Sequence, residues 1–171
     1  MLGNKINKTG LGQANISGTN NQNVGILNSN LTLNIDAGKL VLTGSSDGLG
    51  INIANSFAAN VSVGATLDIN GISNNSDVNT AGLKFNDSTY TLSGGGKINF
   101  AGTAVNGTGN GIGLDLNVGT MNVSDGTSVN LTGKSANGIG LRNGNFNINT
   151  QGGTVKLLSL IHISEPTRPE R

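Results

Sequence analysis

The chain has 171 residues, of which 28 are glycine and none is cysteine, and its formal net charge is +1. Such a neutral balance argues against the basic footprint of a nucleic-acid-binding protein. The lack of cysteine excludes a disulfide framework and a cysteine-based metal site. The abundance of Gly, Asn, Ser and Thr would suit a disordered chain, but the apolar residues alternate regularly, which indicates folded strands.

Residues 1–19 are a polar, loosely patterned lead-in to the regular part of the chain. Ile6 and Ile16 fit an incomplete first turn of the repeat that follows. The lead-in lacks the apolar stretch of a signal peptide, and the sequence has no transmembrane run. We expect the sequence to be an internal piece of a longer exported chain.

A strand pattern marked by a glycine then recurs five times. In its clearest copy, Ile112, Leu114 and Leu116 alternate with small or polar residues, as in a strand with one buried face. The marker glycines are Gly25, Gly50, Gly82, Gly113 and Gly140, which are 25, 32, 31 and 27 residues apart. A loose period of about thirty residues with strands in every period is typical of a stacked repeat.

Two further strand patterns accompany the first. One ends in a glycine and occupies residues 39–44, 66–71, 97–102 and 128–133. The other is shorter and occupies residues 33–35, 61–63, 90–92, 121–123 and 146–148. Three short strands per turn, joined by Gly, Asn, Ser and Asp residues, predict an all-β parallel β-helix (a solenoid) of about five turns over residues 20–157.

Stacking the turns in this register predicts what lies inside and outside. Three apolar columns fill the interior: Ile26, Ile51, Leu83, Leu114 and Leu141; Leu40, Leu67, Ile98, Val129 and Val155; and Leu42, Ile69, Phe100, Leu131 and Leu157. This interior leaves no room for a cofactor, and we expect none. We expect the five marker glycines to face outward, beside a column formed by Leu27, Asn52, Lys84, Asp115 and Arg142.

Lys84, Asp115 and Arg142 are the candidate ligand face, with Asp115 between two cations. The first interpretation is a carbohydrate site. The second, which we favour, is a solvated ion-pair ladder in which each pair contributes about 0–1 kcal/mol. One carboxylate between two cations is not the paired arrangement of glycoside hydrolysis. The single histidine, His162, lies near the C-terminus, so we predict no catalytic residue, no cofactor-binding residue and no metal ligand.

The repeat pattern breaks at Leu158. The segment that follows contains the single histidine, both prolines and both glutamates of the chain. Residues 158–168 resemble the translation of a sequencing adapter, so we expect residues 158–171 to be a non-native or disordered tail that contributes nothing to folding. The alternative is that Leu160, Ile161 and Ile163 dock on the open end of the last turn.

The recurring Asn-Gly-Ile-Gly-Leu and Ser-Val-Asn-Leu-Thr-Gly motifs resemble the passenger regions of bacterial autotransporters and related β-helical adhesins, over about residues 20–157. The resemblance implies a right-handed β-helix at the bacterial cell surface. It also implies a signal peptide and a C-terminal outer-membrane barrel elsewhere in the full chain. The expected partners are further turns of that chain and surface glycans or proteins, and not nucleic acid.

From this resemblance we expect a binding rod and not an enzyme. Two alternatives stay open. One is a polysaccharide-degrading β-helix enzyme with Lys84, Asp115 and Arg142 at its site. The other is the β-helix of a phage tail fibre.

Overall fold

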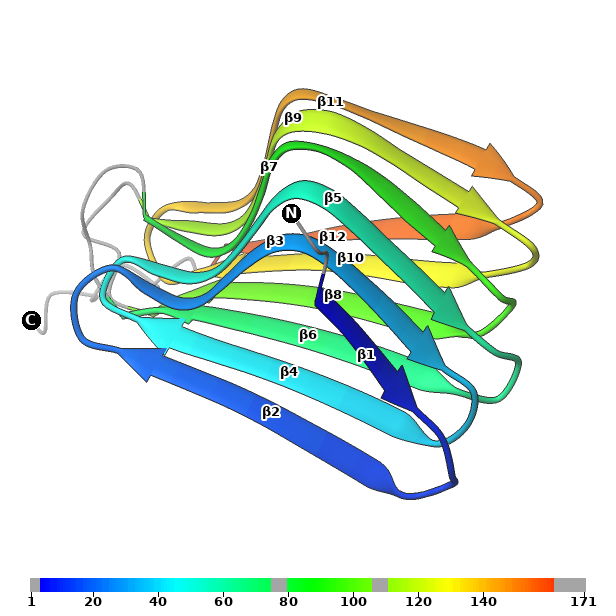
Figure 1. Ribbon diagram of the computed structural model, residues 1–171. Coiled ribbons are helices and arrows are strands. Elements are labelled where there is room, and N and C mark those ends of the chain that lie inside the picture. Colours follow the sequence, from blue (N-terminus) through cyan, green and yellow to red (C-terminus); the bar gives the residue numbers. More distant parts are fainter. Residues whose placement is uncertain (1–3, 75–79, 106–110, 162–171) are drawn as a thin grey trace, which may run out of the picture.

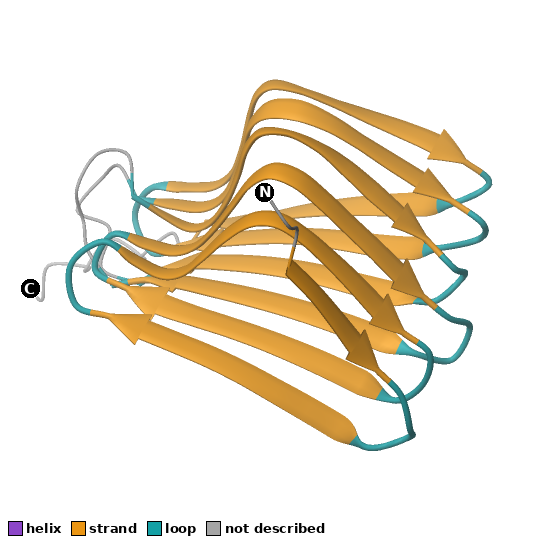
Figure 2. Ribbon diagram, in the orientation of Figure 1, coloured by secondary structure: helices purple, strands orange, loops and turns teal. Residues whose placement is uncertain are grey.

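The computed structural model describes residues 4–74, 80–105 and 111–161, and these form two six-stranded parallel sheets with no helix among them (Figures 1 and 2). Sheet A holds the odd-numbered strands: β1 (Asn4–Lys8), β3 (Val24–Ile35), β5 (Leu49–Val61), β7 (Ala81–Ser93), β9 (Ile112–Ser124) and β11 (Ile139–Gln151). Sheet B holds the even-numbered strands: β2 (Gln13–Asn20), β4 (Lys39–Ser46), β6 (Thr66–Ser73), β8 (Lys97–Ala104), β10 (Ser128–Ser135) and β12 (Thr154–Ile161).

The chain passes from sheet A to sheet B and back in every turn. Each strand pairs in parallel with the strand two places before it and the strand two places after it, so one turn consists of one strand from each sheet. Five turns, from β3 and β4 to β11 and β12, follow a shorter turn made by β1 and β2 (Figure 1). The prediction of a parallel β-helix of about five turns is confirmed.

Two of the three strands predicted for each turn are one continuous, bent strand in sheet A. In β3, residues 24–28 and 33–35 belong to the same strand. Asn30 in β3 and Asn55 in β5 have positive φ angles of 58° and 63°, and the register between β3 and β5 shifts just there, between Ser29 and Leu31. A bulge of this kind bends a strand without ending it. The bend is visible as the steep rise in β7, β9 and β11 (Figure 1).

The bulges make the distance from the marker glycine to the third pattern unequal between turns. Leu33, Ala59 and Leu92 share one column of sheet A. Counted from Gly25, Gly50 and Gly82, they lie 33 − 25 = 8, 59 − 50 = 9 and 92 − 82 = 10 residues further on.

The predicted third strand pattern is therefore out of register at three of its four steps from one turn to the next, and only residues 90–92 and 121–123 pair as predicted. Ile35 pairs with Val61, so residues 61–63 lie two residues too far along the chain to match residues 33–35, and Val63 is 83% exposed. Likewise Ile148, and not Phe146, pairs with Met121. Between β3, β5 and β7 the bulges insert residues that the alternation does not locate. The pairing of β9 with β11 has no register shift, so the placement of Phe146 was wrong without a bulge.

The interior is apolar, and the three predicted columns stack in the predicted register. Five aromatic rings fill the wide part of the space between the sheets: Phe57, Phe85, Tyr90, Phe100 and Phe146. Phe85 packs edge-on against Tyr90 and Phe100, with ring centroids 4.7 and 5.0 Å apart, a favoured aromatic geometry. The Tyr90 hydroxyl donates to the Ile53 carbonyl at 2.9 Å, which satisfies the buried polar group.

The expectation that the marker glycines face solvent is wrong. Gly113 is buried, and a Cβ atom there would lie 2.5 Å from the Lys134 carbonyl oxygen in β10. In return, a Cβ atom at Gly133 would collide with the Gly140 carbonyl group in β11. The starts of β3, β5, β7, β9 and β11 thus lie backbone to backbone against the ends of sheet B strands, an approach that only glycine permits.

Strand β12 continues across the boundary predicted at Leu158. Leu158 to Ile161 pair with Thr132 to Ser135 of β10 in unbroken parallel register. An extended segment can add to an open sheet edge through backbone hydrogen bonds alone, and Leu158 and Leu160 remain 50% and 44% exposed. Ile163 and the rest of residues 162–171 lie outside the described residues.

Candidate functional site

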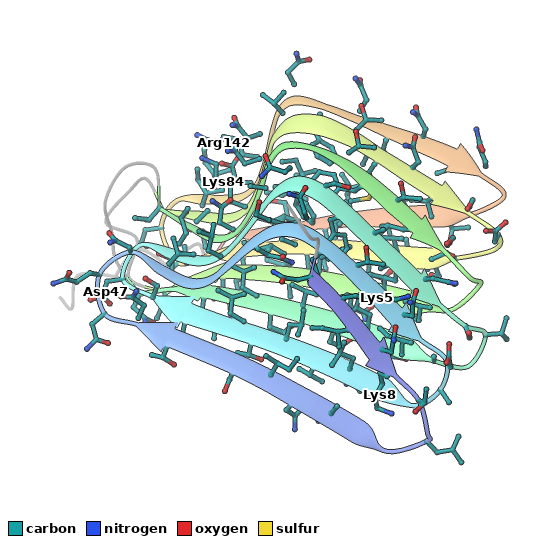
Figure 3. All side chains as sticks on the ribbon, viewed as in Figure 1. Lys5, Lys8, Asp47, Lys84 and Arg142 are labelled. Carbon is teal, nitrogen blue, oxygen red and sulfur yellow. The ribbon has the colours of Figure 1, made fainter. Side chains whose placement is uncertain are left out.

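The predicted ligand face lies on three adjacent strands of sheet A. Lys84 of β7 pairs in register with Asp115 of β9, and Asp115 pairs with Arg142 of β11. Asn52 of β5 extends the same column by one strand. Lys84 and Arg142 lie near the bend of sheet A, on its outer side (Figure 3). The structure therefore places all three predicted residues in one column.

Asp115 and Arg142 form a two-pronged ion pair. Arg142 donates from Nε to Asp115 Oδ1 at 2.9 Å and from its terminal Nη2 to Oδ2 at 2.7 Å. The Asp115 side chain is only 1% exposed, whereas the Arg142 side chain is 37% exposed. The hydrogen bond to Asp115 raises the pKa of Arg142 above its ordinary value and outweighs burial, which lowers it. The guanidinium stays charged at every working pH.

The burial of Asp115 corrects the expectation of a solvated ladder. A carboxylate that is buried and whose two oxygens both accept from one arginine is shielded from a substrate, so it is poorly suited to act as a nucleophile or general base. Its arrangement resembles that of a structural pair, in which removing one partner strands a buried charge.

Lys84 is not drawn into this pair. Of the ion pairs between described residues, none includes Lys84. Next to it in register lies Asn52, whose Oδ1 atom is buried and receives no hydrogen bond in the described part of the chain. The sequence predicted that Asn52 lies in the same column as Lys84, Asp115 and Arg142. The alternation of residues gave no sign that its side-chain oxygen would be buried without a hydrogen bond.

A second polar surface, which the sequence did not single out, covers the outer face of sheet B. Its centre is a chain of hydrogen bonds across four strands. Asn130 Nδ2 donates to Asn99 Oδ1 at 2.7 Å, and Asn99 Nδ2 donates to Asp68 Oδ1 at 2.6 Å. Lys39 Nζ lies 2.6 Å from Asp68 Oδ2. The available signal was the polar residue at the same place in three of the four glycine-ended patterns, where the first pattern has Val41 instead.

Two shallow hollows lie on this outer face. One, of about 530 Å³, is lined by side chains of β8, β10 and β12, including Ala101, Thr132 and Lys156. The other, of about 320 Å³, is lined by Thr103 and Lys134 among others. Both hollows are open to solvent. The first lies where the short side chains of Ala101 and Thr132 leave space between longer neighbours.

The described residues contain no cluster of three or more His, Cys, Asp or Glu side chains that would suit a metal ion. Within that same part of the chain, no helix has the length and apolar character needed to cross a membrane.

No protein-family model matches the chain, and searches for similar curated proteins and for similar solved structures likewise find no match.

Proposed function

We propose that this chain is a segment of an autotransporter-like bacterial adhesin, in which it forms a rod that displays polar faces for attachment to a host or to neighbouring cells. The observation that carries the proposal is the uninterrupted stack of parallel turns. Each turn covers the apolar face of its neighbour and presents alternating polar side chains outward. At about 4.8 Å per layer, five turns extend roughly 24 Å along the axis.

The state of Asp115 supports a binding role over a catalytic one. Polysaccharide-cleaving chemistry needs an ionisable group that reaches the substrate, and both oxygens of this carboxylate are held by Arg142. The ion pair of Asp115 and Arg142 therefore serves to hold β9 and β11 together at the bend of sheet A.

The proposal places the full-length protein at the bacterial outer membrane, exported by means of a signal peptide and a C-terminal barrel. Its partners are surface glycans or proteins, together with further β-helix turns of the same full-length chain. The uninterrupted gene tests this directly, because it should encode an upstream signal peptide and a downstream barrel. A solitary reading frame of enzyme size would contradict the proposal.

At the bench, the purified chain is incubated with acidic and with neutral polysaccharides, and both binding and the release of reducing ends or unsaturated ends are measured. We expect binding without cleavage, both for this chain and for Asp115→Ala if that variant folds. Cleavage that disappears in a folded Asp115→Ala variant would overturn the rod and favour the enzyme. A stable trimer in solution would favour the tail fibre instead.

A further inference from the structure

Side chains on one half of the outer face of sheet B form a cationic surface. In β8, β10 and β12 the residues at alternate positions point outward: Lys97, Asn99, Ala101, Thr103; Ser128, Asn130, Thr132, Lys134; and Thr154, Lys156, Leu158, Leu160. This set contains three lysines and no acidic residue. All three lysines are exposed. We call these outward side chains of β8, β10 and β12 the lysine face.

The neighbouring acidic group does not offset this charge. Asp68 of β6 is the nearest carboxylate on the outer face of sheet B in the described part of the chain, and its two oxygens contact Asn99 and Lys39. Lys39 neutralises it, and among the described residues none of the three lysines of the lysine face forms an ion pair.

The asparagines between the lysines keep hydrogen-bonding capacity for a ligand. An amide nitrogen has two N–H donors, and Asn99 and Asn130 each use one of them along the chain that leads to Asp68. Because both amides donate in the same direction, the oxygen of Asn130 ends the chain on the side of β12, where Lys156 is its register partner. The row therefore offers donors, an acceptor and a cation in sequence.

The spacing of the lysines selects for an extended ligand. Neighbouring strands are about 4.8 Å apart, and a strand rises about 3.3 Å per residue. On this basis the Cα atom of Lys156 lies roughly 12 Å from that of Lys97 and roughly 14 Å from that of Lys134, and the Cα atoms of Lys97 and Lys134 are roughly 20 Å apart. One small anion cannot contact all three lysines, whereas a chain that carries regularly spaced negative charges can. Between them, the hollow over Ala101 and Thr132 gives such a chain room to lie close to the sheet.

We propose that the lysine face binds an acidic polysaccharide, a polymer of uronate-type sugars whose carboxylates contact the lysines and whose hydroxyl groups contact the asparagine row. This inference rests on the proposed attachment function and names its ligand class. A single-stranded nucleic acid fits less well, because the lysine face has no aromatic side chain on which bases could stack.

The test compares two charge-matched double variants of the full chain. Lys134→Gln with Lys156→Gln removes two cations from the lysine face. Lys5→Gln with Lys84→Gln removes two cations from sheet A, where Figure 3 shows both lysines. Dissociation constants are measured at low salt for polygalacturonate, neutral dextran and single-stranded DNA, after far-UV circular dichroism has confirmed that both variants fold.

We expect the chain to bind polygalacturonate, with an affinity that falls as salt is added. The lysine-face variant should bind roughly five- to thirty-fold more weakly, as the loss of two exposed charge contacts implies. The dissociation constant of the sheet A variant for polygalacturonate should stay within about twofold of that of the unaltered chain, because charges far from the binding surface are screened.

Equal losses in the two variants, or binding of DNA or dextran as tight as that of polygalacturonate, would overturn the inference. Absence of polygalacturonate binding in a chain that still attaches to cells would refute this ligand class and leave the proposed attachment function standing. A chain that neither binds polygalacturonate nor attaches to cells would refute both the ligand class and the proposed attachment function.

Discussion

The two sheets of the solenoid are built from the same turns, yet they differ in regularity. Every strand of sheet B has 8 residues and pairs with its neighbours without a register shift. In sheet A the strands range from 5 to 13 residues, and register shifts interrupt three of the five pairings. Four of the five clustered aromatic rings belong to sheet A. Sheet A therefore bends to accommodate bulk, while sheet B stays even.

This difference predicts where the fold is sensitive. The two sheets share one core and one zone of close backbone contact, so changes there should be equally damaging in either sheet. On the outer faces the sheets should diverge, because the bend of sheet A buries polar groups that the even face of sheet B leaves in water.

The largest effect should come from a charge placed in the shared core. Leu114 of sheet A and Leu131 of sheet B are both fully buried. Leu114→Asp and Leu131→Asp should each lower the free energy of unfolding by more than about 4 kcal/mol, since each buries an unpaired carboxylate. Thermal unfolding measures this, with the outward-facing Thr132→Asp as control. A strong effect in one sheet only would show that the sheets do not share a core.

The next largest effect should come from the zone where the sheets touch. A Cβ atom at Gly102 would lie 2.6 Å from the Gly113 carbonyl carbon and 2.9 Å from the Leu83 nitrogen, and backbone atoms cannot move aside. Gly102→Ala should cost about 2–3 kcal/mol of stability, in the range of overpacked sites.

Gly12 is the matched control for this substitution, because a Cβ atom there meets nothing within 4 Å and its φ is not positive. Gly12→Ala should change the free energy of unfolding by less than about 1 kcal/mol, in either direction. Equal losses at the two glycines in chemical denaturation would contradict the close contact of the sheets.

The two ion pairs sharpen the comparison of the outer faces. Arg142→Met in sheet A leaves the buried Asp115 carboxylate without donors and should cost about 2–3 kcal/mol. Lys39→Met in sheet B breaks a pair whose side chains are 41% and 17% exposed, and should cost about 0–1 kcal/mol. A double-mutant cycle with Asp115→Asn measures the coupling in sheet A. Coupling near zero there would mean that the bend gives Asp115 no special protection.

The smallest effect should come from the end of sheet B. Truncation after Leu157 removes Leu158 and Leu160, which remain about half exposed, so little apolar area is lost. We expect the unfolding midpoint to shift by less than about 2 °C, in line with a change well under 1 kcal/mol. A drop of several degrees would show that the segment belongs to the folded unit.

Register was predictable where the spacing between apolar residues is constant. Leu83 stacks on Leu114, and Lys84 on Asp115, because no residue is inserted between the marker glycine and these positions. In β3, β5 and β7 the third pattern was misplaced because bulges add residues after Ser29 and Ala54, and nothing in the alternation indicates where an extra residue goes. In β11, which pairs with β9 without a register shift, the alternation fits Phe146 as well as Ile148.

Alternation also shows which residues share a face, but not whether that face is covered. Gly113 and Leu114 are successive residues of one strand, yet both are buried, because the ends of the sheet B strands cover the glycine. The burial of Asp115 was missed for a related reason. Its shielding depends on Arg142 folding over it from the next turn and on the bend of sheet A, and neither is encoded in the spacing of a single turn.

The pairing of each strand only with the turns before and after it has a mechanical consequence. A force that pulls the two ends of the chain apart along the axis loads the outermost turn first, and the remaining turns stay intact behind it. Between Gly82 and Gly113 one turn contains 113 − 82 = 31 residues, which extend to roughly 100 Å when released. Under tension the rod should therefore lengthen in discrete steps of about this size, a stepwise yielding suited to a tether that bears intermittent load.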